Sequence, residues 1–387
     1  MHVYLDNNAT TRPAPEVVAC MQECLQQSWG NPSSVHRTGM DARRRVELAR
    51  SSVAQLVGCE AREVVFTSGG TEAVNLAIGG AFRRIHRGEP GRRLLASLPT
   101  EHPAVSDSIR GISALGGESL WLRMDAHGVV DLRSLEELLE RRGEEIALCS
   151  VMWANNETGV IQPVEEIARR CREHGVVFHT DAVQWVGREP TRLEETSIDL
   201  LSCSAHKFHG PKGAGALVVR GGPGVEPTLV GGPQERERRG GTENVPAIAG
   251  FGVACDLARA WLAEDRRRER LEVRDRFESR LLALHEGASI NSAGAPRLWN
   301  TTSVAFPGLR AQMLLVILSE HGVSASGGAA CASGSVEVSG VLRAMGVDEE
   351  RAAGSLRLSF SRETTEPELD DALRVIDSVL ASSRGGA

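Results

Sequence analysis

The sequence predicts an α/β fold in which helices cover a mainly parallel sheet, followed by a smaller C-terminal domain. Three observations lead to this prediction. Short apolar runs alternate with amphipathic helical patterns over most of the chain. Polar residues repeatedly follow the ends of the apolar runs. After about residue 255 the pattern changes, and a long charged helical segment precedes the last strands.

The elements of the larger domain follow one another along the chain. Residues 63–82 are typical of a strand, a glycine turn and a helix, and residues 146–159 of a strand and a polar loop. Three more strands are predicted within residues 175–184, 197–207 and 213–220. Ligands of open α/β sheets bind at the carboxyl ends of the strands, so the polar residues there are candidates for a binding site.

The C-terminal part combines short strands with helices. Residues 253–285 are predicted to form a charged helical connector. The predicted strands and helices beyond it lie within residues 301–308, 311–321, 355–361 and 366–380. We therefore predict a large domain of residues 15–255 and a small domain of residues 1–14 and 256–387, with the N-terminal arm packing on the small domain.

Composition indicates an ordinary globular protein. The 387 residues are 41% hydrophobic and 25% charged, and the net charge of -7 gives no reason to expect a nucleic acid or an anionic membrane as partner. We find neither a secretory signal nor a run of about eighteen apolar residues, and we expect a cytoplasmic protein without a membrane partner. The eight cysteines then predict no disulfide framework, and we expect no metal site.

Both lysines of the chain stand in one stretch, "SAHKFHGPKGAGAL", at Lys207 and Lys212. All other cations among the 44 Lys and Arg residues are arginines. A lysine amine can lose its proton and attack a carbonyl carbon, which an arginine cannot do. At least one of the two is therefore a candidate to form a Schiff base with an aldehyde cofactor. The alternative is that both remain by chance in an arginine-rich composition.

Other polar residues would suit such a cofactor. The stretch "TSGGTEA", residues 67–73, offers glycines and a threonine at a helix N-terminus for a phosphate, although helix caps often have this composition. Asp181 could hold a protonated ring nitrogen or simply cap a turn. Gln184 could reach a ring oxygen, and His102 could stack on the ring or be a solvated loop residue. Each signal is modest, but their order along the strands favours one site.

Nine motifs together resemble one family. They are "YLDNNATT" (4–11), "WGNPSSVH" (29–36), "FTSGGTEAVNLA" (66–77), "TEHPAV" (100–105), "NNETGVIQPV" (155–164), "HTDAVQ" (179–184), "SAHKFHGPKGAGAL" (204–217), "GGPQERERRGGTENV" (231–245) and "GGAACASGS" (327–335). The chain resembles the NifS/IscS-like cysteine desulfurases of the class V aminotransferase group. The resemblance implies a pyridoxal phosphate enzyme of fold type I, with a large domain around a mainly parallel seven-stranded-type sheet and a smaller α+β C-terminal domain.

The resemblance also implies roles for individual residues. Lys207 would bind the cofactor aldehyde, Asp181 the pyridine nitrogen and Gln184 the phenolic oxygen, while His102 would stack on the ring and move protons. Asn156 and Arg357 would hold the substrate carboxylate, for which a bidentate arginine is suited. Phosphate contacts are expected from Gly70, Thr71, Ser204, His206 and, across a homodimer interface, Thr242.

The implied reaction takes sulfur from L-cysteine, releases L-alanine and leaves a persulfide on Cys331. The sulfur then passes to an acceptor protein, which the sequence does not identify: iron–sulfur cluster assembly, thiolation or another biosynthetic pathway all remain open. The alternatives are a selenocysteine lyase, another class V lyase or aminotransferase, or a non-catalytic sulfur-transfer partner.

Overall fold

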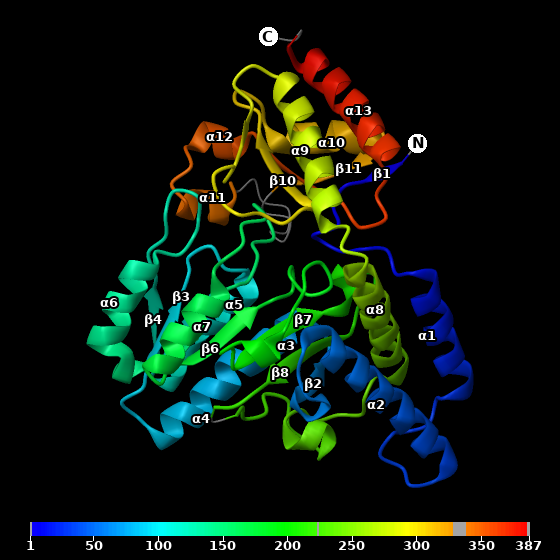
Figure 1. Ribbon diagram of the computed structural model, residues 1–387, viewed down its shortest axis with the longest axis vertical. Helices are drawn as coiled ribbons and strands as arrows, with labels where there is room; N and C mark the ends of the chain where they lie inside the picture. The colour runs from blue at the N-terminus through cyan, green and yellow to red at the C-terminus, as the bar shows by residue number, and fades with distance from the viewer. Residues whose placement is uncertain (1, 223, 328–337, 385–387) are drawn as a thin grey trace.

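The chain folds around a seven-stranded sheet. We describe a computed structural model that covers residues 2–222, 224–327 and 338–384. The strand order is β2-β8-β7-β6-β5-β3-β4, with only β8 antiparallel to its neighbours (Figure 1). The strands are β2 (Val64–Thr67), β3 (Leu94–Ser97), β4 (Glu118–Trp121), β5 (Ile146–Ser150), β6 (Val177–Asp181), β7 (Leu200–Ser204) and β8 (Gly215–Val219). The predicted α/β fold with a mainly parallel sheet is therefore confirmed.

Helices cover this sheet on both faces. They are α1 (Pro15–Gln27), α2 (Arg37–Val57), α3 (Gly70–Asn75), α4 (Ala81–Gly88), α5 (Pro103–Gly111), α6 (Leu132–Arg142), α7 (Val164–Glu173) and α8 (Val245–Ala263). Every residue of β2, β3, β5 and β7 is buried, as is typical of parallel strands with helices on either side, whereas the edge strand β4 is mostly exposed. Two separate hydrophobic clusters fill the two sides.

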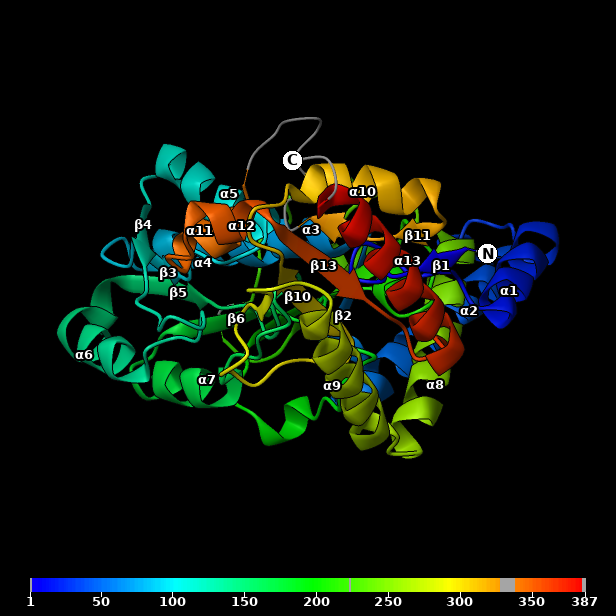
Figure 2. The ribbon, with the colours of Figure 1, turned by 90° about the horizontal axis from the view of Figure 1, so that it is seen from above.

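A four-stranded antiparallel sheet lies apart from the first, with the order β12-β13-β10-β9. Its strands are β9 (Ser289–Ile290), β10 (Thr301–Ala305), β12 (Ser326–Gly327) and β13 (Ser355–Ser359). The helices of this part are α9 (Arg267–Ala283), α10 (Ala311–Glu320), α11 (Gly340–Ala344), α12 (Glu349–Ala353) and α13 (Glu366–Arg384). Helices α9, α10 and α13 pack around the sheet and share one hydrophobic cluster with it (Figure 2).

The N-terminal arm joins this smaller part. Strand β1 (Val3–Tyr4) pairs with β11 (Val323–Ser324), and the N–H of Asn7 donates to the carbonyl oxygen of Ser359 at 3.1 Å. The exact domain limits stay a prediction, and residue 255 falls inside α8. The charged connector consists of two helices, α8 and α9, because the chain leaves helical geometry between them and Asp265 has a φ of 50°.

Helix α8 is long and apolar enough to cross a membrane by length and composition alone. It is the only such helix in the described part of the chain, and 61% of its most apolar window is buried inside the fold. It packs against α1 and α2. Burial among other helices explains the apolar composition of α8 as that of a core helix.

Candidate active site

A cavity of about 740 Å³ opens where β6 and β7 end. Carboxyl ends of parallel strands meet at one edge of a sheet, so residues far apart in sequence converge there. The predicted site residues that line the cavity are Gly70, Thr71, His102, Asn156, Asp181, Gln184, Ser204, His206, Lys207 and Arg357. Thr242 is exposed and does not line it, and Cys331 lies outside the described residues.

Of the two lysines, only Lys207 reaches the cavity. It ends the short 3-10 turn Ala205–Lys207 that follows β7. Its Nζ donates to the carbonyl oxygens of Asn8 at 2.7 Å and Ala9 at 2.9 Å, both in the N-terminal arm. Lys212 is exposed and does not line the cavity. The geometry therefore favours Lys207 as the lysine that reacts with a carbonyl group.

Asp181 is a buried carboxylate at the end of β6, with 6% of its surface exposed. Its Oδ1 accepts a hydrogen bond from the N–H of Val183 at 3.0 Å. Burial raises the pKa of Asp181, while the charges of His102 and Lys207 lower it. A cationic ring nitrogen placed against Asp181 would offset this burial and favour the carboxylate.

The imidazole of His102 has a defined tautomer when it is neutral. His102 caps helix α5, and its Nδ1 accepts the N–H of Ala104 at 3.0 Å. A backbone N–H can only donate, so the proton of the neutral ring is on Nε2. The ring therefore lines the cavity with its orientation fixed by the helix cap.

The residues expected to hold a phosphate form a small cup. A Cβ at Gly70 would lie 2.8 Å from Cγ2 of Val183, so a larger residue would fill the cup. The Oγ of Ser204 is buried and has no hydrogen-bond partner among the described residues. Burial, together with the charges of Lys207, Lys212 and Arg188, lowers the pKa of His206 to about 4. An orphaned hydroxyl beside the first turn of α3 fits the oxygens of a phosphate.

Arg357 stands on β13, so the small sheet closes one side of the cavity. Its side chain is 3% exposed, its Nη1 donates to the carbonyl oxygen of Asn156 at 3.0 Å and its Nη2 to Oδ1 of Asp6 at 2.7 Å. Nε has no hydrogen-bond partner among the described residues. The guanidinium thus has a buried donor left for a carboxylate of a ligand.

Sequence reasoning missed two buried carboxyl groups in the cavity wall. Burial raises the pKa of Glu157 to about 7, and its Oε2 accepts from Oγ of Ser339 at 2.5 Å. Burial also raises the pKa of Glu101 well above its ordinary value, and its Oε1 accepts the N–H of Met152 at 2.7 Å. Both stand in recognised motifs, but nothing in the sequence separates them from the many surface glutamates.

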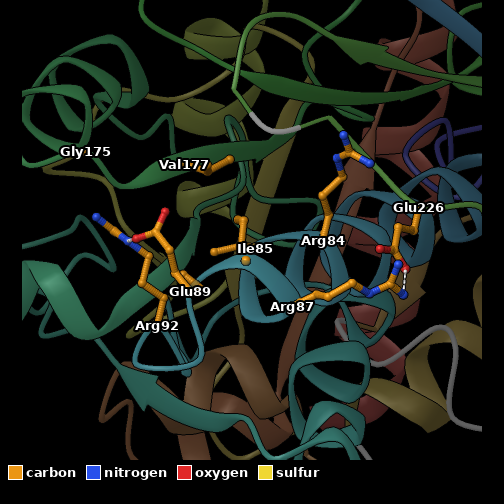
Figure 3. Close-up of a pocket in the computed structure, with 10 residues that line it drawn as sticks. Arg84, Ile85, Arg87, Glu89, Arg92, Gly175, Val177 and Glu226 are labelled. Carbon is orange, nitrogen blue, oxygen red and sulfur yellow. Dashed lines mark hydrogen bonds and ion pairs between the residues drawn. The ribbon is translucent and has the colours of Figure 1, made fainter.

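A second pocket, of about 440 Å³, lies at the end of α4 (Figure 3). Its arginines have partners: Arg87 pairs with Glu226 at 3.0 Å, and Arg92 with Glu89 at 2.8 Å. None of the predicted site residues lines it. The pocket therefore adds nothing to the site at the ends of β6 and β7.

Comparisons with known proteins agree with this geometry. The profile of the aminotransferase class-V family matches residues 3–372. The chain belongs to the class-V aminotransferase family. Cysteine desulfurase 2 of Trichormus variabilis is 43% identical over 382 residues, which cover 99% of this chain and 94% of that protein. A solved NifS-like protein is similar with a TM-score of 0.89 and 37% identity, over 99% of this chain and 100% of the other.

A further solved structure, SspA in complex with cysteine, has a TM-score of 0.79 and 30% identity and covers 94% of this chain and all of the other. Proteins of this family that desulfurate cysteine depend on pyridoxal phosphate. The predicted family, the fold type and the activity of a pyridoxal-phosphate-dependent cysteine desulfurase acting on L-cysteine are therefore confirmed.

Proposed function

We propose that the cavity at the ends of β6 and β7 is the site at which this chain takes sulfur from L-cysteine. One observation carries the proposal: a lysine, a buried carboxylate and a buried arginine line a single cavity beside an orphaned serine hydroxyl. Pyridoxal phosphate, when bound, supplies an aldehyde that combines with amines and a ring that accepts the electron pair left at Cα.

The cofactor would be held by residues from three strand ends. Gly70, Thr71, Ser204 and His206 surround the place for its phosphate, and Thr242 of a second subunit would add a further contact. Asp181 would face the ring nitrogen, because a buried carboxylate favours a cation beside it. The amide nitrogen of Gln184 would donate to the phenolic oxygen, and the imidazole of His102 would lie against the ring.

The substrate would be oriented by its carboxylate. The guanidinium of Arg357, with the help of Asn156, would bind that carboxylate and so place Cα near Lys207. The Nζ of Lys207 would take the α-proton, for which it must be neutral at that moment. His102 would hold or return a proton at Nε2, since its Nδ1 is occupied by the cap of α5.

Sulfur transfer would use Cys331, which the sequence motif assigns. The Cys331 thiolate attacks Sγ of the substrate, an S–S bond forms and the Cβ–S bond breaks, with the electron pair passing to Cβ. Protonation at Cβ then gives alanine. L-cysteine and the enzyme thiol are thereby converted into L-alanine and an enzyme persulfide, without an external oxidant or reductant.

We further propose a cytoplasmic homodimer that passes the persulfide sulfur to an acceptor protein, for example in iron–sulfur cluster assembly. Support for the dimer comes from large apolar residues near the segment that bears Thr242. Val230 is 77% exposed, and Leu229 beside it accepts the N–H of Gly240 at 2.8 Å. Trp29 and Val35 are 72% and 92% exposed before α2. Large apolar residues exposed near this segment favour a protein interface there.

Product analysis with L-cysteine tests the function. With a reductant to release the persulfide, the purified protein should form sulfide and L-alanine in equal amounts. Parallel reactions with L-selenocysteine would measure the preference between the two substrates. Pyruvate in place of alanine would contradict the proposal and favour a lyase that eliminates sulfide, while a keto acid formed from the intact carbon skeleton would favour an aminotransferase.

A further inference from the structure

Arg188 is a buried cation that connects three segments of the active site. It follows β6 by a short turn and is 4% exposed. Its Nη1 donates to the backbone oxygen of Gln184 at 2.8 Å, and its Nη2 to the backbone oxygens of Asn7 at 3.3 Å and Lys207 at 3.2 Å. No carboxylate in the described part of the chain lies within ion-pair distance of it.

Arg188 also fixes the side-chain amide of Gln184. Nη1 of Arg188 donates to Oε1 of Gln184. An arginine has five donors and no acceptor, so only the oxygen of the amide can face it. The amide nitrogen of Gln184 must then lie on the other side, where it donates to the carbonyl oxygen of Asn8 at 3.0 Å.

The oriented amide suits the proposed cofactor contact. An amide nitrogen carries two hydrogens, and the bond to Asn8 uses one of them. Gln184 lines the cavity, so its second N–H can serve a ligand oxygen. A phenolate oxygen accepts hydrogen bonds, which the opposite amide orientation could not provide.

The same hydrogen-bond network includes the reactive lysine. The carbonyl oxygen of Asn8 accepts both Nζ of Lys207 and Nε2 of Gln184, at 2.7 Å and 3.0 Å. Nη2 of Arg188 binds the backbone of that lysine. One guanidinium therefore contacts the N-terminal arm, the turn after β6 and the turn after β7.

We infer that Arg188 is a positioning residue, which presents the amide nitrogen of Gln184 to the cofactor and holds the backbone that carries Lys207. The inference rests on the cofactor-binding roles proposed above for Gln184 and Lys207. Nothing in the sequence pattern singles out this arginine, because arginines are common in the chain. Its position between the three segments is visible only in the folded protein.

The charge of Arg188 has an effect of its own. Burial lowers the pKa of Arg188 to about 9, so the group stays protonated at neutral pH. The titratable groups that interact electrostatically with Arg188 are Arg357 on β13, His206 and His209. The backbone oxygen of Lys207 accepts a hydrogen bond from Arg188. Asp181 is a carboxylate whose pKa the charge of Lys207 lowers. Arg188 contacts the turn that carries Lys207, and a positive charge near an amine favours the neutral form of that amine.

Three variants of the holoenzyme separate geometry from charge. Arg188→Met removes both, Arg188→Lys keeps the charge but loses the planar fork, and Arg192→Met is a matched control whose side chain is 69% exposed. The pH titration of the visible absorption of the lysine-bound cofactor reports the protonation of that nitrogen. Its midpoint should rise by about one pH unit in Arg188→Met and should remain near the wild-type value in the other two variants.

A double-mutant cycle with Gln184→Leu tests the orientation of the amide. In the wild-type background, Arg188→Lys should weaken the affinity for pyridoxal phosphate about tenfold by loss of the Gln184 hydrogen bond. In the Gln184→Leu background the same change should have a clearly smaller effect, because only the backbone hydrogen bonds of Arg188 to Asn7 and Lys207 are then left to lose. Equilibrium dialysis measures the affinity, and circular dichroism checks the fold.

Additive effects in the cycle, or an unchanged titration midpoint in a folded Arg188→Met protein, would overturn the inference. If Arg188→Met does not fold, the cycle with Arg188→Lys decides alone. If the proposed function itself were wrong, the experiment would give a third result, different from both of these. The wild-type protein itself would then bind no pyridoxal phosphate through Lys207, and no visible absorption would be available to titrate.

Discussion

The Nη2 of Arg357 and the Oδ1 of Asp6 lie 2.7 Å apart, so the arginine expected to bind substrate already holds a carboxylate of the chain. Arg357 belongs to β13 of the small sheet, and Asp6 belongs to the N-terminal arm that runs beside it. The ion pair fixes the guanidinium plane before any ligand binds. A preformed fork costs less conformational entropy when the substrate carboxylate arrives.

The first prediction follows from this pair. Arg357→Ala should raise the KM for L-cysteine about 10- to 100-fold, because a charged hydrogen-bonded contact with the substrate is lost. The visible absorption of the bound cofactor should stay. Asp6→Asn breaks the same ion pair but keeps the guanidinium, and should change KM far less. Equal increases in KM for the two variants would mean that the ion pair, and not a substrate contact, matters.

Much of this fold could be predicted because its strands are short apolar runs with polar residues after them. Asp181 and Lys207 are recognisable for that reason, since Asp181 ends β6 and Lys207 ends the short turn after β7. The family resemblance assigns Arg357, which the pattern of apolar residues alone places in an ordinary strand. Local sequence was enough wherever the functional residue and its strand are neighbours in the chain.

Contacts between distant segments could not be predicted in this way. The hydrogen bond from Lys207 to Asn8 joins residues 199 positions apart, and that from Arg188 to Asn7 joins residues 181 apart. The burial that raises the pKa of Glu157 likewise depends on the C-terminal part of the chain packing over it, where Ser339 donates to its carboxylate. Such environments exist only once both sheets have folded.

The second prediction distinguishes the two lysines. Lys207→Ala should lose the visible absorption that arises when the cofactor aldehyde is joined to a lysine, because Lys207 alone reaches the cavity. Lys212→Ala should keep it, since Lys212 is exposed to solvent. Absorption spectra of the two purified variants, each dialysed against pyridoxal phosphate, make the comparison. The reverse pattern would show that the wrong lysine has been assigned.

The third prediction concerns Glu157. Its pKa is about 7 in the folded protein, against an ordinary value of 4.5, so between these pH values the folded state binds more protons than the unfolded state. The free energy of unfolding therefore falls as pH rises through this window and levels off above it. Glu157→Gln removes the titratable group and so the fall in the free energy of unfolding. The variant keeps a side-chain oxygen that can accept the hydrogen bond from the hydroxyl of Ser339.

Relative to the wild type, Glu157→Gln should gain roughly 3 kcal/mol of stability between pH 4.5 and pH 8. Urea unfolding at pH 5, 6, 7 and 8 measures the difference, and the exposed Glu140→Gln serves as the control. A constant difference between the Glu157→Gln variant and the wild-type protein across this range would show that Glu157 is ionised throughout and that its burial is relieved in solution.

The fourth prediction assigns the persulfide. Burial raises the pKa of both Cys59 and Cys203 to about 12, so neither supplies a thiolate at neutral pH. Cys331→Ser should keep the visible absorption of the cofactor but release almost no sulfide, whereas Cys59→Ser should remain active. After limited L-cysteine, mass spectrometry should find the added sulfur on the peptide with Cys331. Sulfur on another peptide would refute the assignment.

The last prediction tests whether Thr242 serves the site of the partner subunit. Thr242 is exposed and does not line the cavity of its own chain. We expect the Lys207→Ala homodimer to have little activity and the Thr242→Ala homodimer to have reduced activity, because both sites of each homodimer are defective. Coexpression with two different tags gives a mixed dimer of the two variants.

If Thr242 acts across the interface, the Thr242→Ala chain keeps its own Lys207 and receives an intact threonine from the other chain, so one complete site forms. The mixed dimer should then regain about half of the tight pyridoxal phosphate sites of the wild type, measured by titration of the visible absorption. If Thr242 acts within its own chain, every site in the mixed dimer lacks one of the two residues, and the strong binding would not return. Sedimentation of the wild-type protein as a fully loaded, active monomer would likewise rule out the shared site.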